Sequence, residues 1–177
     1  MKNLAHFLER INLWVGGAVR WLCIVMVINT FITVLLRHFF DTGSIKLQES
    51  VIYLHGIVFM LGAAYTYAQN EHVRVDIFYQ KMSPTKQLVV DVLGNIFLLM
   101  PLCVFIFWMS LNYVEASWNI QEKSSEAGGL AWVYWLKSLL LLMPALLMIQ
   151  AISNSLLNIS KLLSRSHEYQ AHKDGVL

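Results

Sequence analysis

Long apolar stretches, separated by short polar connections, dominate the order of residues along this chain. A helix crosses the roughly 30 Å hydrocarbon core of a bilayer in about 20 predominantly apolar residues. Each stretch is long enough for one crossing, with allowance for tilt. We therefore predict an all-α fold, an integral membrane four-helix bundle that forms a single domain over residues 1–177. The expected spans are 14–36, 51–68, 88–108 and 132–157, followed by a cytoplasmic tail at 158–177.

The polar connections set a limit on function, because none is long enough to bury a hydrophobic core of its own. Hydrophobic residues make up 57% of the chain and charged residues 14%, a composition that a water-soluble domain of this length does not have. The net charge is only +2, and the basic residues are spread singly, so nucleic-acid binding has no support. Whatever the chain does is expected to happen inside or against the membrane.

Lys and Arg residues outside the spans predict the orientation of the chain. Four crossings place both termini and the middle connection on one side, and that side carries the larger number of basic residues. By the positive-inside bias, both termini are expected in the cytoplasm. The connection at 115–130 is then external, and it carries three acidic residues, Glu115, Glu122 and Glu126, against Lys123.

Prolines and glycines predict local features of the helices and turns. Ser83 and Pro84 are typical of an N-cap and a first helical residue, so the third helix is expected to begin there. Pro101 and Pro144 each remove one backbone hydrogen bond within a span, which predicts kinks. The adjacent Gly128 and Gly129 predict a tight turn, with a positive φ, in the external connection.

The string from Asn70 to Asp76 is the most distinctive polar segment. Read as the cytoplasmic end of the second helix, it stacks His72 over Asp76 at the i and i+4 positions, with Arg74 between them. A charged helix end stabilised by local pairs and a partner contact are both consistent with this string.

Candidate chemistry inside the membrane is sparse. Ion-coupled carriers usually place ionisable residues deep in the bundle, whereas Glu49, Asp91, Glu115 and Lys137 all lie toward span edges. Cys23 and Cys103 lack the spacing of a metal or redox motif, so neither a metal nor a cofactor site is predicted. The chain is not expected to be an enzyme or to carry solute alone.

Histidine raises the main alternative. Four-helix membrane anchors of haem- or quinone-linked oxidoreductases hold haem between axial histidines on facing helices. This chain has six histidines, but only His55 lies well inside a span. A haem anchor, a small autonomous exporter and an assembly or signalling protein stay open as alternatives.

Several short strings, taken in order, resemble one family of membrane proteins. They are Arg37-His38-Phe39-Phe40-Asp41, Leu47-Gln48-Glu49, Phe59-Met60-Leu61-Gly62-Ala63-Ala64, His72-Val73-Arg74-Val75-Asp76, Ser117-Trp118 with Glu122 and Ser124, and Gly128-Gly129-Leu130 with Lys137. Their order and spacing across four spans resemble the small membrane subunit, of the DctQ type, of tripartite ATP-independent periplasmic (TRAP) transporters. One departure is the single Glu49 after Gln48, where many relatives have a Glu-Glu pair.

The resemblance implies an auxiliary permease subunit of a sodium-gradient-driven symporter in the bacterial inner membrane. The implied partners are a large multi-helix membrane subunit, whose scaffold the chain braces, a periplasmic substrate-binding protein that docks on the complex, and membrane lipid. The implied cargo is an organic acid. The residues expected at partner interfaces are Arg37, Glu49, His72, Arg74, Asp76, Glu122, Glu126, Gly128 and Gly129.

Overall fold

The structure is a computed structural model of the chain. It describes the backbone of residues 2–72 and 77–173 and, within these ranges, the side chains up to residue 164. The helical elements are α1 (Lys2–Phe40), α2 (Ile45–Ala68), the short 3-10 turn η1 (Tyr79–Lys81), α3 (Pro84–Gly94), the π-helical segment η2 (Asn95–Leu99), α4 (Met100–Asn119) and α5 (Val133–Lys173).

The described residues include four helices long and apolar enough to cross a membrane, as the hydropathy pattern predicts. They are α1, α2, the continuous run from α3 through α4, and the Val133–Ser164 part of α5. The helices extend beyond the predicted spans. Helix α1 begins at Lys2, and α5 continues to Lys173 through the predicted tail. Hydropathy predicts only the lipid-crossing part of a helix. The helix itself can extend further, because its backbone hydrogen bonds also form outside the lipid.

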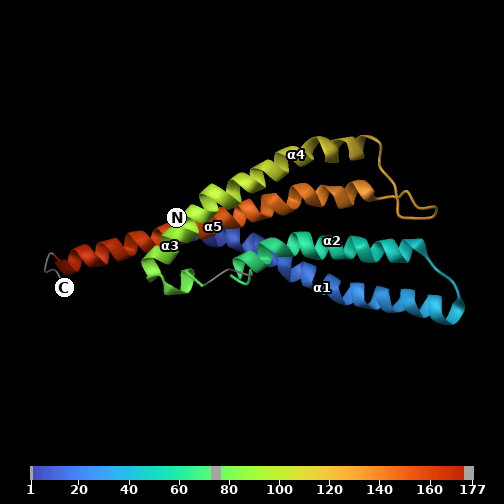
Figure 1. The fold of residues 1–177 in the computed structure, drawn as a ribbon, viewed down its shortest axis with the longest axis horizontal. Helices are drawn as coiled ribbons and strands as arrows, with labels where there is room; N and C mark the ends of the chain where they lie inside the picture. Colours follow the sequence, from blue (N-terminus) through green and yellow to red (C-terminus); the bar gives the residue numbers. More distant parts are fainter. Residues whose placement is uncertain (1, 73–76, 174–177) are drawn as a thin grey trace.

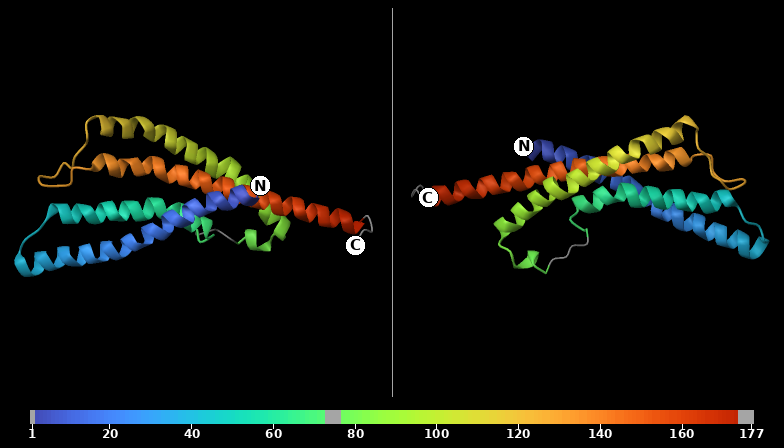
Figure 2. Two further views of the ribbon diagram at one scale, coloured as in Figure 1. Left: turned by 180° about the vertical axis from the view of Figure 1, so that it is seen from behind. Right: turned by 45° about the horizontal axis from the view of Figure 1, so that its top comes forward.

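The helices form two antiparallel hairpins, α1 with α2 and α4 with α5, that meet where α2 packs against α5 (Figures 1 and 2). Helix α5 also contacts α1 and α3, so it is the central element. A third of its apolar window is buried, compared with 6% for α1 and for α2 and 11% for the α3–α4 run. Within the described residues, α4 makes no substantial contact with α1 or α2. The predicted bundle is therefore open rather than closed around a four-sided core.

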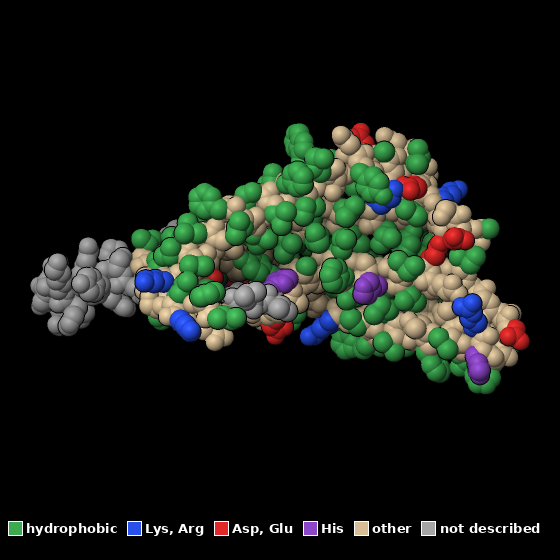
Figure 3. All heavy atoms as spheres, in the orientation of Figure 1, with side chains coloured by type: hydrophobic (Ala, Val, Ile, Leu, Met, Phe, Trp, Pro, Cys, Tyr) green, Lys and Arg blue, Asp and Glu red, His purple; other side chains and the backbone are tan. Residues whose placement is uncertain are grey.

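We call the end of the molecule with the connections 41–44 and 120–132 the loop end, and the opposite end the terminus end (Figure 1). Hydrophobic side chains cover the middle of the face in Figure 3, and charged ones lie mostly toward its two ends. Large side chains such as Trp108, which is 73% exposed, would be unfavourable in water but suit a lipid or protein neighbour.

Left-handed residues stop the helices. Asp41, Asn70 and Gln121 have φ values of 47°, 63° and 45°, and each follows the last residues of a helix. A residue in this conformation turns the chain away from the helix axis. Helix α2 therefore ends at Ala68, so His72 lies beyond the helix that was expected to include it. Asp76, its predicted partner, lies outside the described residues.

The third crossing begins at Pro84, as predicted, but the Ser83 side chain makes no capping hydrogen bond. The π-helical segment η2 ends two residues before Pro101, the position of a predicted kink, and the Met100 N–H bonds to the carbonyl of Asn95. Proline clashes with the carbonyl four residues earlier, and a widened turn relieves that clash. Pro144 lies fully buried within the continuous helix α5.

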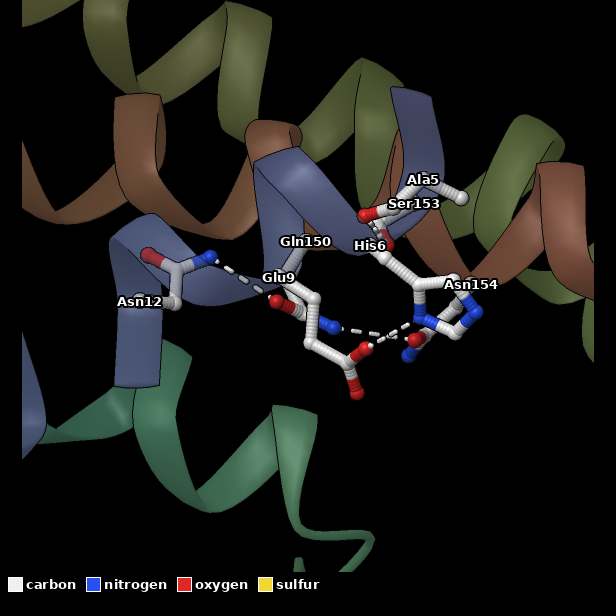
Figure 4. Close-up of polar contacts among 7 residues, drawn as sticks. All are labelled: Ala5, His6, Glu9, Asn12, Gln150, Ser153 and Asn154. Atoms are coloured by element: carbon white, nitrogen blue, oxygen red, sulfur yellow. Dashed lines mark hydrogen bonds and ion pairs between the residues drawn. The ribbon is translucent and has the colours of Figure 1, made fainter. Parts of the chain in front are cut away.

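Buried amides fasten α1 to α5 near the terminus end (Figure 4). The Asn12 amide donates to Oε1 of Gln150 at 2.9 Å and to the Leu146 carbonyl at 3.2 Å. Gln150 in turn donates to Asn154, and the Ser153 hydroxyl donates to the Ala5 carbonyl at 2.8 Å. Interhelical hydrogen bonds of this kind hold helices together where lipid removes the ordinary hydrophobic drive.

Replacing Asn12 by leucine should loosen this contact. The change leaves the buried Oε1 of Gln150 without its donor, which costs about 1–3 kcal/mol. The double variant with Gln150→Leu should recover part of that loss, because both polar partners are then gone. Thermal unfolding of the purified single and double variants checks this. Additive losses in the double variant would contradict a direct coupling of the two side chains.

Candidate functional site at the loop end

The connection between α4 and α5 folds back onto the start of α2, where Glu49 lies half-buried. One carboxylate oxygen of Glu49 accepts a hydrogen bond from the Ser124 hydroxyl. The other accepts one from the backbone N–H of Leu130 at 2.5 Å. We call this set of contacts the loop anchor. Because an ionised carboxylate forms stronger hydrogen bonds than a neutral acceptor, the loop anchor fixes both ends of the 124–130 loop to α2.

The loop is also closed by bonds of its own. The Ser124 N–H donates to the Leu130 carbonyl at 2.9 Å, and the Gly129 N–H donates to the Glu126 carbonyl at 3.0 Å. The Ser124 hydroxyl accepts from the Glu126 N–H at 3.1 Å while it donates to Glu49. The 124–130 loop is therefore held both by bonds within it and by the Glu49 carboxylate.

The two adjacent glycines serve different purposes. Gly128 has a φ of +83°, which confirms the expected positive-φ turn. At Gly129 the constraint is space, because an added Cβ would lie 2.5 Å from the Ser124 hydroxyl oxygen and 2.8 Å from the Glu49 carboxylate. The second glycine thus allows the loop to approach the loop anchor closely.

A second polar contact joins the end of α4 to the start of α5. Glu122 forms an ion pair with Lys137, whose ammonium also lies 4.1 Å from the ring centroid of Tyr113. Nearby, the Trp118 indole donates to the Ser138 hydroxyl at 2.8 Å. The Trp118 ring packs edge-on against Tyr134 and Trp135 as well. Aromatic side chains with a polar edge are typical of a membrane–water interface.

The Glu122 ion pair predicts a pH dependence of stability. The hydrogen bond from Lys137 lowers the pKa of Glu122 below its ordinary value. A lowered pKa means that the pair stabilises the folded state fully above the ordinary glutamate pKa, and that this contribution is lost as pH falls through the folded-state pKa. Below about pH 4.5, the thermal unfolding temperature of the wild type should therefore decrease more than that of Glu122→Gln. Parallel profiles for the two proteins would contradict the prediction.

The comparisons with known proteins identify the family. Residues 9–161 match the family model described as tripartite ATP-independent periplasmic transporters, DctQ component. The chain belongs to the DctQ family. It is also 29% identical over 122 residues to a TRAP transporter small permease protein of Haemophilus influenzae, an alignment that spans 67% of this chain and 66% of that relative. No solved structure matches the chain.

Membership of the DctQ family makes this a transporter component of the inner membrane rather than an enzyme. The predicted family resemblance is confirmed, and the oxidoreductase-anchor alternative is set aside. His55, the histidine that raised this alternative, is an exposed side chain stacked on Phe59 with a centroid distance of 6.1 Å. The matched range contains the whole loop anchor.

The structure brings together some of the predicted interface residues of this DctQ chain. Glu49 and Gly129 meet at the loop anchor, and Gly128 precedes Gly129 in the same loop. Arg37 is exposed in the last turn of α1, where its charge suits the helix C-terminus. Glu126 is exposed near the tip of the loop.

Other predicted residues lie elsewhere. Glu122, grouped with Glu126 in the sequence, is engaged with Lys137. His72 lies near the terminus end, where its Nε2 is 3.0 Å from the Ala63 carbonyl. Arg74 and Asp76 fall outside the described residues. The predicted set is therefore not one site.

Sequence reasoning missed the buried amides of Asn12, Gln150 and Asn95. Asn95 accepts from the Tyr67 hydroxyl and donates to Ser155 at 3.2 Å, which joins α2, η2 and α5. An amide within or beside an apolar stretch is a usable signal, because such a side chain needs a partner in lipid. The partner itself could not be read from the sequence.

Proposed function

We propose that this DctQ chain is the auxiliary small permease subunit of a sodium-gradient-driven importer of organic acids. It braces the scaffold of a larger transport subunit, and its loop end, on the periplasmic side, helps a substrate-binding protein to dock. The observation that carries the proposal is the combination of an anchored polar loop with wide exposed apolar helix faces in one small membrane domain.

The bracing role is supported by how the helices are held. Asn12, Asn95, Gln150 and Ser153 are buried, and each makes at least one hydrogen bond to another helical element, which stiffens the array. The outer faces of α1 and α4 remain apolar and exposed. A stiff domain with a lipid-compatible lateral surface is suited to pack against another membrane subunit.

A photo-reactive side chain placed on these faces tests the brace. Phe31 on α1 is 64% exposed and Phe105 on α4 is 62% exposed, so a photo-reactive phenylalanine analogue fits at either position. After expression with the rest of the transporter, at least one position should cross-link to a single large membrane polypeptide. Cross-links from both positions to lipid alone would reject the brace.

The docking role is supported by the exposure of Glu126 above a fixed backbone. Its N–H and carbonyl maintain the loop, while its carboxylate makes no hydrogen bond or ion pair among the described residues. A charged group presented this way contributes to the encounter of two proteins more than to the fold of its own chain.

Charge reversal at Glu126 tests docking. In proteoliposomes containing the assembled transporter, Glu126→Lys should raise the binding-protein concentration needed for half-maximal uptake about two- to fivefold, with less effect at high salt. The matched control is Glu9→Lys, which reverses a carboxylate at the terminus end. An equal effect of both variants, or of neither, would reject docking at the loop end.

The cargo and the driving force are tested in the same vesicles. Uptake of labelled organic acids should require an inward sodium gradient and should disappear when potassium replaces sodium. Vesicles that contain this chain alone should take up none. Uptake by the chain alone would contradict the auxiliary role.

A further inference from the structure

An apolar groove of about 520 Å³ runs between α1 and α2 in the half of the molecule nearer the terminus end. Its lining includes the small residues Gly16, Gly62 and Ala63 together with Val58 and Phe59. Gly62 has open space where a side chain would be, with no atom within 4 Å of an added Cβ. The open side of Gly62 therefore leaves room along the groove for a narrow apolar chain, whereas Gly16 faces Tyr65.

Two opposite charges also line this groove. Arg20 projects from α1 into it, and Glu71 follows the end of α2. Because helical side chains lean toward the helix N-terminus, Arg20 extends toward the terminus end, where Glu71 lies. Among the described residues neither side chain has an ion-pair partner within 4.0 Å, and the guanidinium of Arg20 rests 5.8 Å from the centroid of the exposed Trp21 ring.

His72 also lines the groove at this end, and its imidazole already has hydrogen-bond partners. Nε2 of His72 lies 3.0 Å from the Ala63 carbonyl and 3.2 Å from the Thr66 hydroxyl, so the imidazole satisfies groups at the end of α2. It neutralises neither Arg20 nor Glu71. The groove thus combines an apolar length with a cation and an anion near the same end, neither of which is paired among the described residues.

We propose that this groove binds one molecule of phosphatidylethanolamine. An acyl chain lies over Gly62, the phosphate accepts from the Arg20 guanidinium, and the ammonium group donates to the Glu71 carboxylate. Arginine pairs well with phosphate, and a long basic side chain near a helix end reaches the headgroup level. The proposal concerns this chain alone and does not depend on its role in transport.

The arrangement of charges selects this occupant among lipids. A purely anionic headgroup such as phosphatidylglycerol would satisfy Arg20 but would face the like charge of Glu71. The quaternary ammonium of phosphatidylcholine has no N–H to donate. A polypeptide helix would fill an apolar groove as well, but it would not by itself bring both charges to one end.

Native mass spectrometry of the full purified chain tests the proposal. After removal of co-purified lipid, the protein is mixed with equal amounts of phosphatidylethanolamine, phosphatidylglycerol and phosphatidylcholine. The wild type should retain phosphatidylethanolamine about two- to fivefold more than either competitor, the range that one accessible ion pair supplies. Arg20→Gln should weaken both phosphatidylethanolamine and phosphatidylglycerol, whereas Glu71→Gln should remove only the preference between them.

A matched pair of glycine substitutions locates the site. Gly62→Leu fills the groove and should lower phosphatidylethanolamine retention to the level of the competitors. Gly17→Leu adds the same side chain to α1 at a position that also has open space and does not line the groove, so retention should be unchanged.

Equal retention of the three lipids by the wild type, or full retention by Gly62→Leu, would overturn the proposal. So would a photo-reactive group at position 62 that cross-links to a polypeptide rather than to lipid in the assembled transporter. Because Arg20→Gln and Glu71→Gln change only surface groups, they keep the test decisive if Gly62→Leu folds poorly.

Discussion

Replacing Glu49 by alanine should release the loop between α4 and α5 and should lower uptake by the assembled transporter. The carboxylate accepts both bonds of the loop anchor, from the Ser124 hydroxyl and the Leu130 N–H. Hydrogen bonds to a charged group are stronger than those between neutral groups, although two bonds to one residue do not add fully. We therefore expect the opening equilibrium of the loop to shift about tenfold toward the open state.

Hydrogen exchange at the Leu130 amide measures this opening directly. The amide should exchange about tenfold faster or more in Glu49→Ala, while the amides of α5 keep their protection. In Glu49→Gln the exchange rate of the Leu130 amide should lie between those of the wild type and Glu49→Ala. The glutamine amide retains one acceptor oxygen but turns a donor toward the other partner. The matched control is Glu115→Ala, which removes an exposed carboxylate near the end of α4.

Unchanged exchange at Leu130 in Glu49→Ala would show that the loop holds its shape through its internal bonds alone. An effect of equal size in Glu115→Ala would attribute the change to the charge of the loop end rather than to the loop anchor. In either case the assignment of Glu49 would be wrong.

The second large effect is expected at Gly16, where α1 packs tightly against Tyr65 of α2. A Cβ at this position would lie 2.2 Å from Cγ and 2.4 Å from Cβ of Tyr65. Because Tyr65 Cβ is fixed to the backbone of α2, side-chain rotation cannot relieve the clash. Gly16→Ala should therefore separate the hairpin and cost at least the 1–3 kcal/mol typical of overpacking.

The neighbouring glycine gives the control for this change. Gly17 has no atom within 4 Å of an added Cβ, and alanine favours a helix over glycine by about 1 kcal/mol. Gly17→Ala should therefore leave the thermal unfolding temperature unchanged or raise it, whereas Gly16→Ala should lower it. A similar shift in both variants would mean that backbone flexibility, rather than the contact with Tyr65, governs the position.

How far the sequence reached can be seen at Glu49 and at Glu122. The sequence places Glu49 near a span edge and Glu122 in the external connection, and both belong to the family pattern. It does not give their partners, because Glu49 meets Leu130 from 81 positions away in the chain and only packing of α2 beside α5 brings them together. Glu122 and Glu126 looked equivalent in the sequence, but the structure engages one with Lys137 and leaves the other exposed.

The sequence by itself determined the all-helical fold and the crossings, because a helix in lipid must satisfy its backbone hydrogen bonds internally and the length of each apolar run therefore predicts a crossing. The order of the short strings indicated the family. The positive φ of Gly128 was equally local. Only the tertiary structure decided that α5 is central, that Asn12 meets Gln150, and that Gly129 and Gly16 are required for close approach. These features depend on which helix faces meet, and almost every face of these helices is apolar enough to meet lipid instead.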